Sequence, residues 1–294
     1  MQHRITQAIT ARADDGPPPA PAGVSVAEPS ARPGRAAFLG GRGAKLFDVS
    51  GRSWIDCDLG GGALILGHAA TAVQSALEAT LASGWSVAAG SDVERLCALI
   101  AAAVPHHDDV RLFAAAWQAQ GFAVAQACLA TGRRAVGRFA HRRDSVGGPI
   151  HARIANGWTV TERTMRYGDA SDLADLAAGH LALAAVIVDA ADFVRDPDGF
   201  EAWLNELSAA CAVQGTRLIL DDTATGFKLA YGGLQEHLGF EADAALFGRI
   251  VGGGIPLAAV TSTRAGADRP ARDAALHGGE SDGGFDPFAL AAGA

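Results

Sequence analysis

Three apolar segments in the second half of the chain constrain its fold most strongly. They cover residues 183–188, 216–220 and 244–247, and each run leads into charged residues. The first segment is a continuous apolar run, which is typical of a strand buried on both faces of a parallel sheet, and we expect the other two to be buried strands as well. A helical pattern at 199–213 separates the first two runs. The alternation therefore predicts an α/β domain, with a mostly parallel central sheet between two layers of helices.

The charged residues that follow these runs mark the place where a ligand is expected. Asp189 follows the first run, Asp221 and Asp222 follow the second, and Arg249 comes one glycine after the third. In open parallel sheets, ligands bind in the crevice beyond the carboxyl ends of the strands. We therefore expect these side chains to gather around one site.

The first half of the chain gives a weaker pattern. A Ser-Gly-Arg turn between residues 44–49 and 53–57 predicts a hairpin. Further elements are predicted by apolar spacing: helices at 68–83, 92–104, 118–130 and 172–178, and a strand at 110–113. We expect residues 1–35, rich in Pro and Ala, to be a flexible tail. Residues 36–80 then form an N-terminal hairpin and helix segment, and residues 81–294 form the large domain.

Composition excludes several classes of protein. With 294 residues, 49% of them apolar, and a net charge of −8, the chain is neither wholly disordered nor suited to nucleic acid or an anionic membrane. No targeting segment and no apolar stretch of membrane-spanning length is visible, which favours the cytoplasm. The four cysteines are scattered and are expected to be free thiols. The sequence His-His-Asp-Asp at 106–109 predicts a solvated turn, so no metal is expected.

Five segments in the same order as in a known family carry a resemblance. They are residues 44–56, 64–68 (Leu-Ile-Leu-Gly-His), 218–227 (Leu-Ile-Leu-Asp-Asp-Thr-Ala-Thr-Gly-Phe), 230–233 and 248–256 (Gly-Arg-Ile-Val-Gly-Gly-Gly-Ile-Pro). On these segments the chain resembles the class-III aminotransferases, and among them especially the glutamate-1-semialdehyde 2,1-aminomutases. These are fold-type-I enzymes of pyridoxal 5′-phosphate. The resemblance implies the large domain of that fold, with the C-terminal small domain missing.

The chain departs from the family where the cofactor is bound. Arg249 occupies the position of the family's lysine, which forms the Schiff base with the cofactor. A guanidinium cannot act as that amine. The only lysines are Lys45, in the hairpin, and Lys228, seven residues after Asp221, and neither is expected to replace it. The family's phosphate-binding segment is replaced by Ala-Ala-Trp-Gln-Ala at 115–119, without its glycine and hydroxyl. The resemblance therefore implies that no cofactor is bound as an aldimine.

Asp221 is the part of the family's site that remains, since it stands where an aspartate keeps the pyridine nitrogen protonated. We expect Asp221 to transfer a proton and Arg249 to bind an anion, as the catalytic pair. The expected substrate-binding residues are Trp117, Gln118, Asp189, Asp222, His141 and Asp282. Asp282 stands at or near the position of a threonine that, in the family, reaches the cofactor phosphate from the partner subunit. Structural roles remain alternatives: space filling for Trp117, a surface position for His141, and an ion pair with Asp221 or Asp189 for Arg249.

These departures predict a pyridoxal-phosphate-independent enzyme on an aminotransferase-like scaffold. Its expected chemistry is acid–base catalysis by a lyase, isomerase or cyclase on a small anionic or planar metabolite, in specialised biosynthesis. One alternative is a catalytically inactive paralogue that acts as a structural or regulatory partner of an active aminotransferase, and another is a ligand-binding scaffold. The resemblance also implies a homodimer, because fold-type-I enzymes build their site at a twofold interface.

Overall fold

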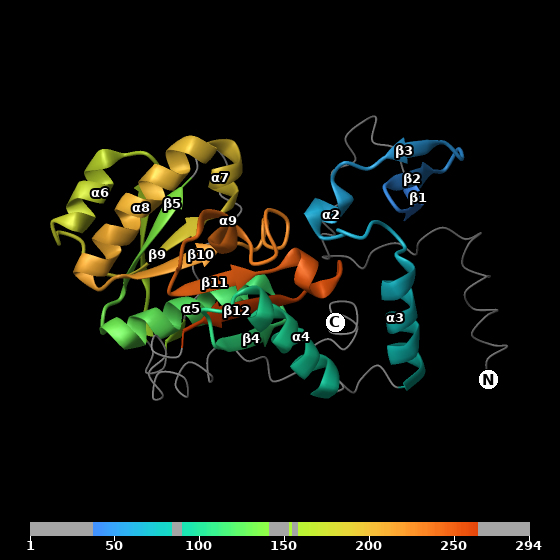
Figure 1. Ribbon diagram of the computed structural model, residues 1–294, viewed down its shortest axis with the longest axis horizontal. Coiled ribbons are helices and arrows are strands. Elements are labelled where there is room, and N and C mark those ends of the chain that lie inside the picture. The colour runs from blue at the N-terminus through green and yellow to red at the C-terminus, as the bar shows by residue number, and fades with distance from the viewer. Residues whose placement is uncertain (1–37, 84–89, 141–152, 155–157, 264–294) are drawn as a thin grey trace, which may run out of the picture.

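The centre of the molecule is a seven-stranded sheet (Figure 1). The computed structural model describes residues 38–83, 90–140, 153–154 and 158–263. The strands run in the order β4 (Asp109–Phe113), β12 (Ala258–Ser262), β11 (Ala244–Phe247), β10 (Arg217–Asp221), β9 (Leu183–Asp189), β5 (Ala135–Ala140) and β8 (Thr161–Arg166). Only β12 runs antiparallel to its two neighbours, and the other four pairings are parallel. The predicted α/β fold with a mostly parallel sheet is confirmed.

Helices cover both faces of this sheet. The helices of the large domain are α4 (Gly90–Ala103), α5 (Ala116–Thr131), α6 (Ala170–Ala177), α7 (Ala191–Arg195), α8 (Pro197–Gln214), α9 (Leu234–Leu238) and the 3₁₀ turn η1 (Arg249–Gly252). The α5 helix packs on one face, against Ile187 and Ile219 among others. Helices α4, α6 and α8 contribute to a second core on the other face, with Val186 and Leu218. Alternate residues of β9 and β10 thus enter different cores, as strands buried on both faces require.

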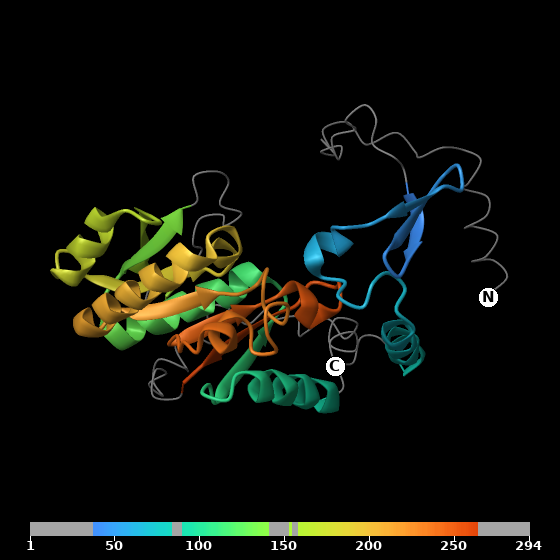
Figure 2. The ribbon, with the colours of Figure 1, turned by 45° about the horizontal axis from the view of Figure 1, so that its top comes forward.

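The N-terminal segment forms a separate small unit beside the sheet (Figure 2). Strands β1 (Phe38–Arg42), β2 (Lys45–Asp48) and β3 (Ser53–Ile55) make an antiparallel sheet, followed by α2 (Leu59–Gly62) and α3 (Thr71–Ser83). The predicted hairpin is β2–β3, and its turn is held by Asp48, which accepts hydrogen bonds from Ser50, Arg52 and Trp54. The unit meets the large domain where α2 contacts η1.

Several elements differ from the prediction. The strands β1, β5, β8 and β12 and the short pair β6 (Arg153–Ile154) and β7 (Trp158–Thr159) were not predicted. The thiols of the four cysteines are free, as expected, but Cys57 is exposed while Cys128 and Cys211 are buried. Within the described ranges, no helix is long and apolar enough to cross a bilayer.

The prediction of a solvated turn at 106–109 is wrong for His107, which is 2% exposed. Its Nδ1 lies 2.7 Å from Thr261 Oγ1 and its Nε2 lies 2.9 Å from the carbonyl oxygen of Ala242. Burial lowers the pKa of His107, so the ring is neutral near pH 7. His107 therefore ties the approach to β4 to β12 and to the residues that precede β11.

Replacing His107 should destabilise the fold. In His107→Ala, a cavity and two unpaired polar groups remain, and we expect the free energy of unfolding to fall by about 2–4 kcal/mol. His180→Ala is the control, because His180 lies on the surface, and its effect should stay within about 0.5 kcal/mol. Urea denaturation followed by circular dichroism measures both, and equal small effects would contradict the structural role of His107.

Candidate active site at the carboxyl ends of the strands

Two carboxylates meet at the carboxyl ends of β9 and β10. Asp221 and Asp189 are directly paired in the register of these two parallel strands. Asp221 Oδ1 accepts hydrogen bonds from the Thr223 hydroxyl at 2.6 Å and from its backbone N–H at 3.2 Å. Asp189 Oδ1 accepts the N–H of Ala191 at 2.9 Å, at the start of α7. The structure thus brings together two of the residues that the sequence predicted.

A third carboxylate makes this edge of the sheet strongly acidic. Burial raises the pKa of Asp192 to about 7, and the charge of Asp189 acts in the same direction, whereas Arg195, 3.0 Å away, opposes it. Burial also raises the pKa of Asp221, again with a smaller contribution from Asp189. A bound positive charge would favour the ionised forms of Asp192 and Asp221, whose pKa values are raised. The sequence analysis missed Asp192, although its place one helical turn after Asp189 could have indicated it.

One arginine whose positive charge acts on Asp221 forms its own contacts with other side chains. Arg138, on β5, is 8% exposed and partly offsets the raised pKa of Asp221. Its guanidinium lies 3.1 Å from Glu162 Oε1 and 2.9 Å from Gln120 Oε1. Arg138 therefore acts on Asp221 through its charge, and among the described residues its ion pair is with Glu162.

Asp222, predicted to bind substrate, lies inside the following loop. Its side chain is fully buried and accepts hydrogen bonds from the Thr225 hydroxyl and, at 2.8 Å, from the N–H of Leu234. Burial raises its pKa, which these two donors partly offset. In the structure Asp222 holds the loop between β10 and α9.

Arg249 does not form the ion pair that was considered for it. The first residue of η1 has a φ of 49°, and its guanidinium donates a hydrogen bond to the carbonyl oxygen of Gly61. Within the described part of the chain, no ion pair joins it to Asp221 or Asp189. The positive φ of Arg249 turns its side chain toward residues 60–62, the glycine turn of α2. The guanidinium therefore interacts with the backbone of that turn.

Lys228 lies at the same glycine turn, which the sequence analysis did not expect. A Cβ atom on Gly62 would collide with Lys228 Nζ, and one on Gly61 would lie 3.3 Å from Arg249 Nη1. The Lys228 amine donates a hydrogen bond to the carbonyl oxygen of Ala224 at 2.6 Å. Burial of the amine, followed by the charge of Arg249, lowers the pKa of Lys228. An amine and a guanidinium thus share one turn beside η1.

The first turn of α5 lies at the same edge, since it follows β4 directly. Ala115 is its N-cap and has no side chain that could accept a hydrogen bond. Trp117 is 60% exposed, so in this chain it does not form the water-excluding wall that was expected of it. Gln118 has a buried Oε1 without a hydrogen-bond partner among the described residues. The remaining candidates, His141 and Asp282, lie outside the described residues.

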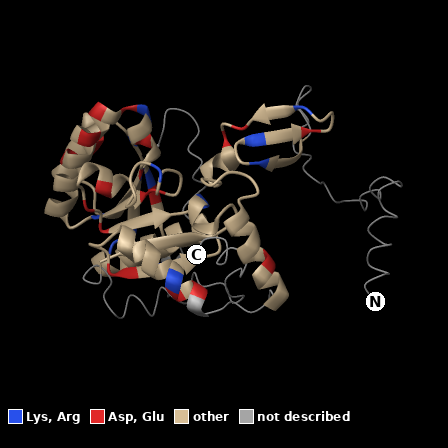
Figure 3. Cartoon of the chain, turned by 45° about the vertical axis from the view of Figure 1, so that its right-hand side comes forward, with Lys and Arg blue, Asp and Glu red and all other residues tan. Residues whose placement is uncertain are grey.

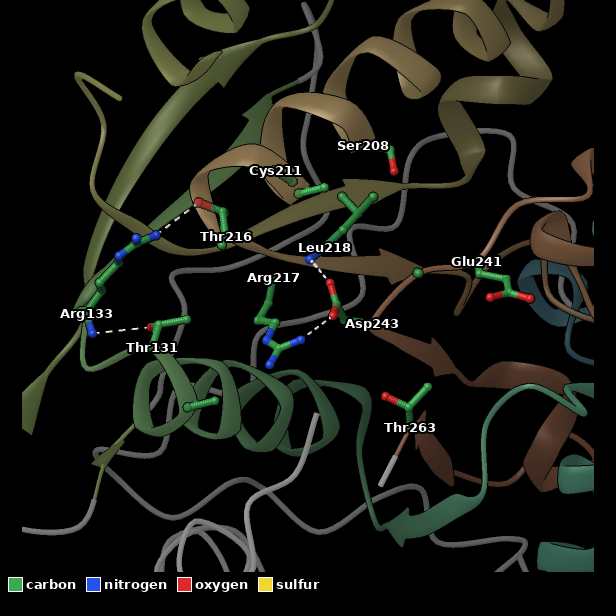
Figure 4. A pocket seen from close by; sticks show the side chains of 14 residues that line it. Thr131, Arg133, Ser208, Cys211, Thr216, Arg217, Leu218, Glu241, Asp243 and Thr263 are labelled. Carbon is green, nitrogen blue, oxygen red and sulfur yellow. Dashed lines mark hydrogen bonds and ion pairs between the residues drawn. The ribbon is translucent and has the colours of Figure 1, made fainter. Parts of the chain in front are cut away.

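A cavity of about 540 Å³ opens at the opposite edge of the sheet (Figure 4). Its arginines are held by the protein itself: Arg217 lies 2.6 Å from Asp243 Oδ1, and Arg133 donates to the carbonyl oxygens of Leu183 and Gln214. It lies at the amino ends of β9 and β10, away from the acidic cluster. Size alone therefore does not make it the candidate site.

Known proteins of similar sequence carry the name of one enzyme. The chain is 33% identical over 248 residues to a glutamate-1-semialdehyde 2,1-aminomutase of Chloroflexus aurantiacus, covering 77% of this chain and 55% of the relative. It is 30% identical over 275 residues to the enzyme of that name from Desulfitobacterium hafniense, covering 86% and 63%. The predicted resemblance to the glutamate-1-semialdehyde 2,1-aminomutases is confirmed. The chain spans a little over half the length of these relatives, and no family model matches it.

Solved structures of an aminotransferase and an aminomutase share the fold of this chain. A β-phenylalanine aminotransferase from Variovorax paradoxus superimposes with a TM-score of 0.69 at 23% identity, covering 88% of this chain and 61% of that one. A glutamate-1-semialdehyde aminomutase from Pseudomonas aeruginosa gives a TM-score of 0.66 at 22% identity, covering 87% and 62%. These likenesses confirm the fold-type-I architecture.

The expectation of a pyridoxal-phosphate-independent lyase, isomerase or cyclase is wrong. The relatives carry the name of an aminomutase, and the similar structures include aminotransferases and an aminomutase, with one transaminase described with pyridoxal phosphate bound. Nothing among them points to cofactor-independent chemistry. The error came from treating Arg249 as decisive for the whole site.

The raised pKa of Asp192 predicts a pH dependence of stability. Between the ordinary pKa of 3.8 and about 7, the folded protein keeps a proton that the unfolded chain releases, so stability falls as the pH rises through this range. Asp192→Asn should remove that component, which is at most about 4 kcal/mol. Thermal unfolding at pH 5 and pH 8 measures it, with Asp198→Asn, an exposed position, as the control. An unchanged pH dependence in Asp192→Asn would refute the assignment.

Proposed function

We propose that this chain binds pyridoxal 5′-phosphate at the carboxyl ends of β9, β10 and β11, and takes part in amino-group transfer on a small amino compound. The observation that carries the proposal is the in-register pair of Asp221 and Asp189, with the raised pKa of Asp221. The names of the relatives and of the similar structures support the chemistry.

The acidic cluster fits the ring of this cofactor. A protonated pyridine nitrogen brings one positive charge to a place where burial and mutual repulsion disfavour the charged form of the acids. Asp221 would accept the N–H of the ring, and ion pairing would then lower its pKa again. Asp189 would add to the negative potential that keeps the ring nitrogen protonated.

The start of α5 fits a phosphate group. Since Ala115 provides no side-chain cap, the first N–H groups of this 16-residue helix are left to an external acceptor. They lie at the positive end of the helix dipole, which favours an anion. Because residues 115–119 lack the family's hydroxyl and glycine, backbone N–H groups of α5 would bind the phosphate.

Residue 249 does not fit covalent attachment of the cofactor. A guanidinium stays protonated and cannot attack an aldehyde. When bound, the cofactor supplies an electron sink for the carbon beside an amino nitrogen. Arg249 would instead hold an anionic group of the substrate through charge-assisted hydrogen bonds, to which its planar fork is suited.

Removing the charge of Asp221 tests the proposal. Asp221→Asn should weaken the binding of pyridoxal 5′-phosphate by at least about tenfold, since an amide holds the protonated ring less well than a carboxylate does. Equilibrium dialysis of the folded variant measures the dissociation constant, with Asp175→Asn, a surface acid, as the control. Equal affinities for the wild type and Asp221→Asn would reject this role, and no binding by the wild type would reject the function.

We also propose that the protein is a homodimer through its N-terminal unit. The α3 helix has no buried residue and carries a single charge, Glu78, so it is mostly tan in Figure 3. Large apolar side chains are exposed throughout this unit: Phe38, Leu39, Phe47, Val49, Trp54, Ile55, Ile65, Leu66 and Leu81. So much exposed apolar surface within one short segment is typical of a protein–protein interface.

A dimer should have twice the chain mass of 29.9 kDa in light scattering at micromolar concentration. Leu39 and Ile55 are 77% and 78% exposed, so the double variant Leu39→Glu, Ile55→Glu should give a monomer with an unchanged circular dichroism spectrum. A monomeric wild type, or a variant that stays dimeric, would contradict this interface.

A further inference from the structure

Lys228 is held in the candidate site by a constrained backbone. The residue before it, Phe227, has a φ of 62°, a conformation that costs free energy for an aromatic residue. The ring of Phe227 packs on Phe247 of β11, with the centroids 5.1 Å apart, and this contact helps to stabilise the strained turn. The turn directs the Lys228 side chain toward α2, where Gly62 leaves room for the amine.

The surroundings of this amine are those of a nucleophile. In the part of the chain that the structure describes, no carboxylate forms an ion pair with Lys228, and its hydrogen bond goes to the Ala224 carbonyl. The carboxylate whose charge acts on the Lys228 amine is Asp222, and its oxygens already accept hydrogen bonds from Thr225 and Leu234. Arg249 adds a permanent positive charge at the same turn. Partial burial and a cationic neighbour both favour a neutral amine, which is the form that attacks carbonyl groups.

We propose that Lys228, and not residue 249, is the amine through which this protein forms a covalent imine with an aldehyde-bearing ligand. The inference deepens the proposed function, which suggests the aldehyde of pyridoxal 5′-phosphate as that ligand. Lys228 is exposed overall, so a ligand can reach it from solvent. Arg249 lies beside it and would pair with an anionic group of the same ligand.

The step balances without an oxidant or reductant. The lone pair of neutral Lys228 Nζ attacks the carbonyl carbon, and the carbonyl oxygen takes up a proton to give a carbinolamine. A second proton on that oxygen lets one water molecule leave, and a C=N bond forms. One amine and one aldehyde thus give one imine and one water. Borohydride then reduces the C=N bond to a stable secondary amine.

Reductive labelling of the full chain tests the proposal, because the chain has only two lysines. The protein is mixed with a small excess of pyridoxal 5′-phosphate near pH 7.5, reduced with borohydride, digested with trypsin and analysed by mass spectrometry. Modified Lys228 blocks cleavage and leaves the peptide 218–249, whereas modified Lys45 leaves the peptide 43–52. We expect labelling at Lys228 to exceed that at Lys45, because burial and the charge of Arg249 lower the pKa of Lys228 and so favour its neutral amine.

Three variants make the test specific. Lys228→Arg should lose the label while it keeps a wild-type circular dichroism spectrum, and Lys45→Arg should keep the label. Arg249→Gln removes the neighbouring charge, so the pH at half-maximal labelling should move upward. Equal labelling of both lysines, or labelling that persists in folded Lys228→Arg, would overturn the inference.

A second aldehyde separates this inference from the proposed function. Glyoxylate carries an aldehyde and an anionic group but no pyridine ring. Preferential reduction of glyoxylate onto Lys228, without binding of pyridoxal 5′-phosphate, would support the reactive amine and reject the proposed cofactor. Reversible binding of pyridoxal 5′-phosphate in dialysis without any label at Lys228 would support the cofactor and overturn the imine.

Discussion

The in-register pairing of β9 with β10 determines the character of the whole site. Five consecutive pairs, from Arg217 with Ala185 to Asp221 with Asp189, align the two strands. Because successive side chains point to opposite faces, a slip of one residue would bring apolar side chains out of both cores. Burial of those side chains therefore fixes the register, and the register forces two carboxylates to lie side by side. The burial of apolar side chains that stabilises the fold therefore also concentrates negative charge at the carboxyl ends of β9 and β10.

The strands that sequence reasoning found are those in which burial on both faces leaves an unbroken apolar pattern, as in β9 and β11. It missed β8, Thr-Glu-Arg-Thr-Met-Arg, because an edge strand needs few apolar residues and only Met165 is buried there. It missed β5 because Gly137 and Arg138 interrupt the apolar run. In β12 all five residues are buried, but Ala-Ala-Val-Thr-Ser has no pattern that separates a strand from a buried helix. Local patterns thus identified the three central strands β9, β10 and β11 and the edge strand β4, and they missed the strands in which the apolar pattern is broken or ambiguous.

Within the candidate site, sequence reasoning succeeded where a residue ends a recognisable strand and failed where a loop decides the position. Asp189 and Asp221 follow apolar runs, so their meeting could be predicted. Lys228 and Arg249 lie in turns whose direction depends on positive φ values at Phe227 and Arg249, and no periodicity encodes those angles. The distance of seven residues from Asp221 to Lys228 gave no information about the path of the chain between them.

The chemistry available to a site depends on the groups that the fold assembles, and less on which position of a motif supplies them. At the edge formed by the strand ends, Asp189, Asp192 and Asp221 provide negative charge, while Lys228 and Arg249 at the glycine turn of α2 provide an amine and a fixed positive charge. The substitution at residue 249 removes an amine from one strand end, yet an amine is still present at the same turn. A ligand with a cationic ring and an anionic or carbonyl-bearing group would complement both halves of this arrangement. The acidic half follows from strand register and the basic half from two strained turns, so the two halves can change independently during evolution.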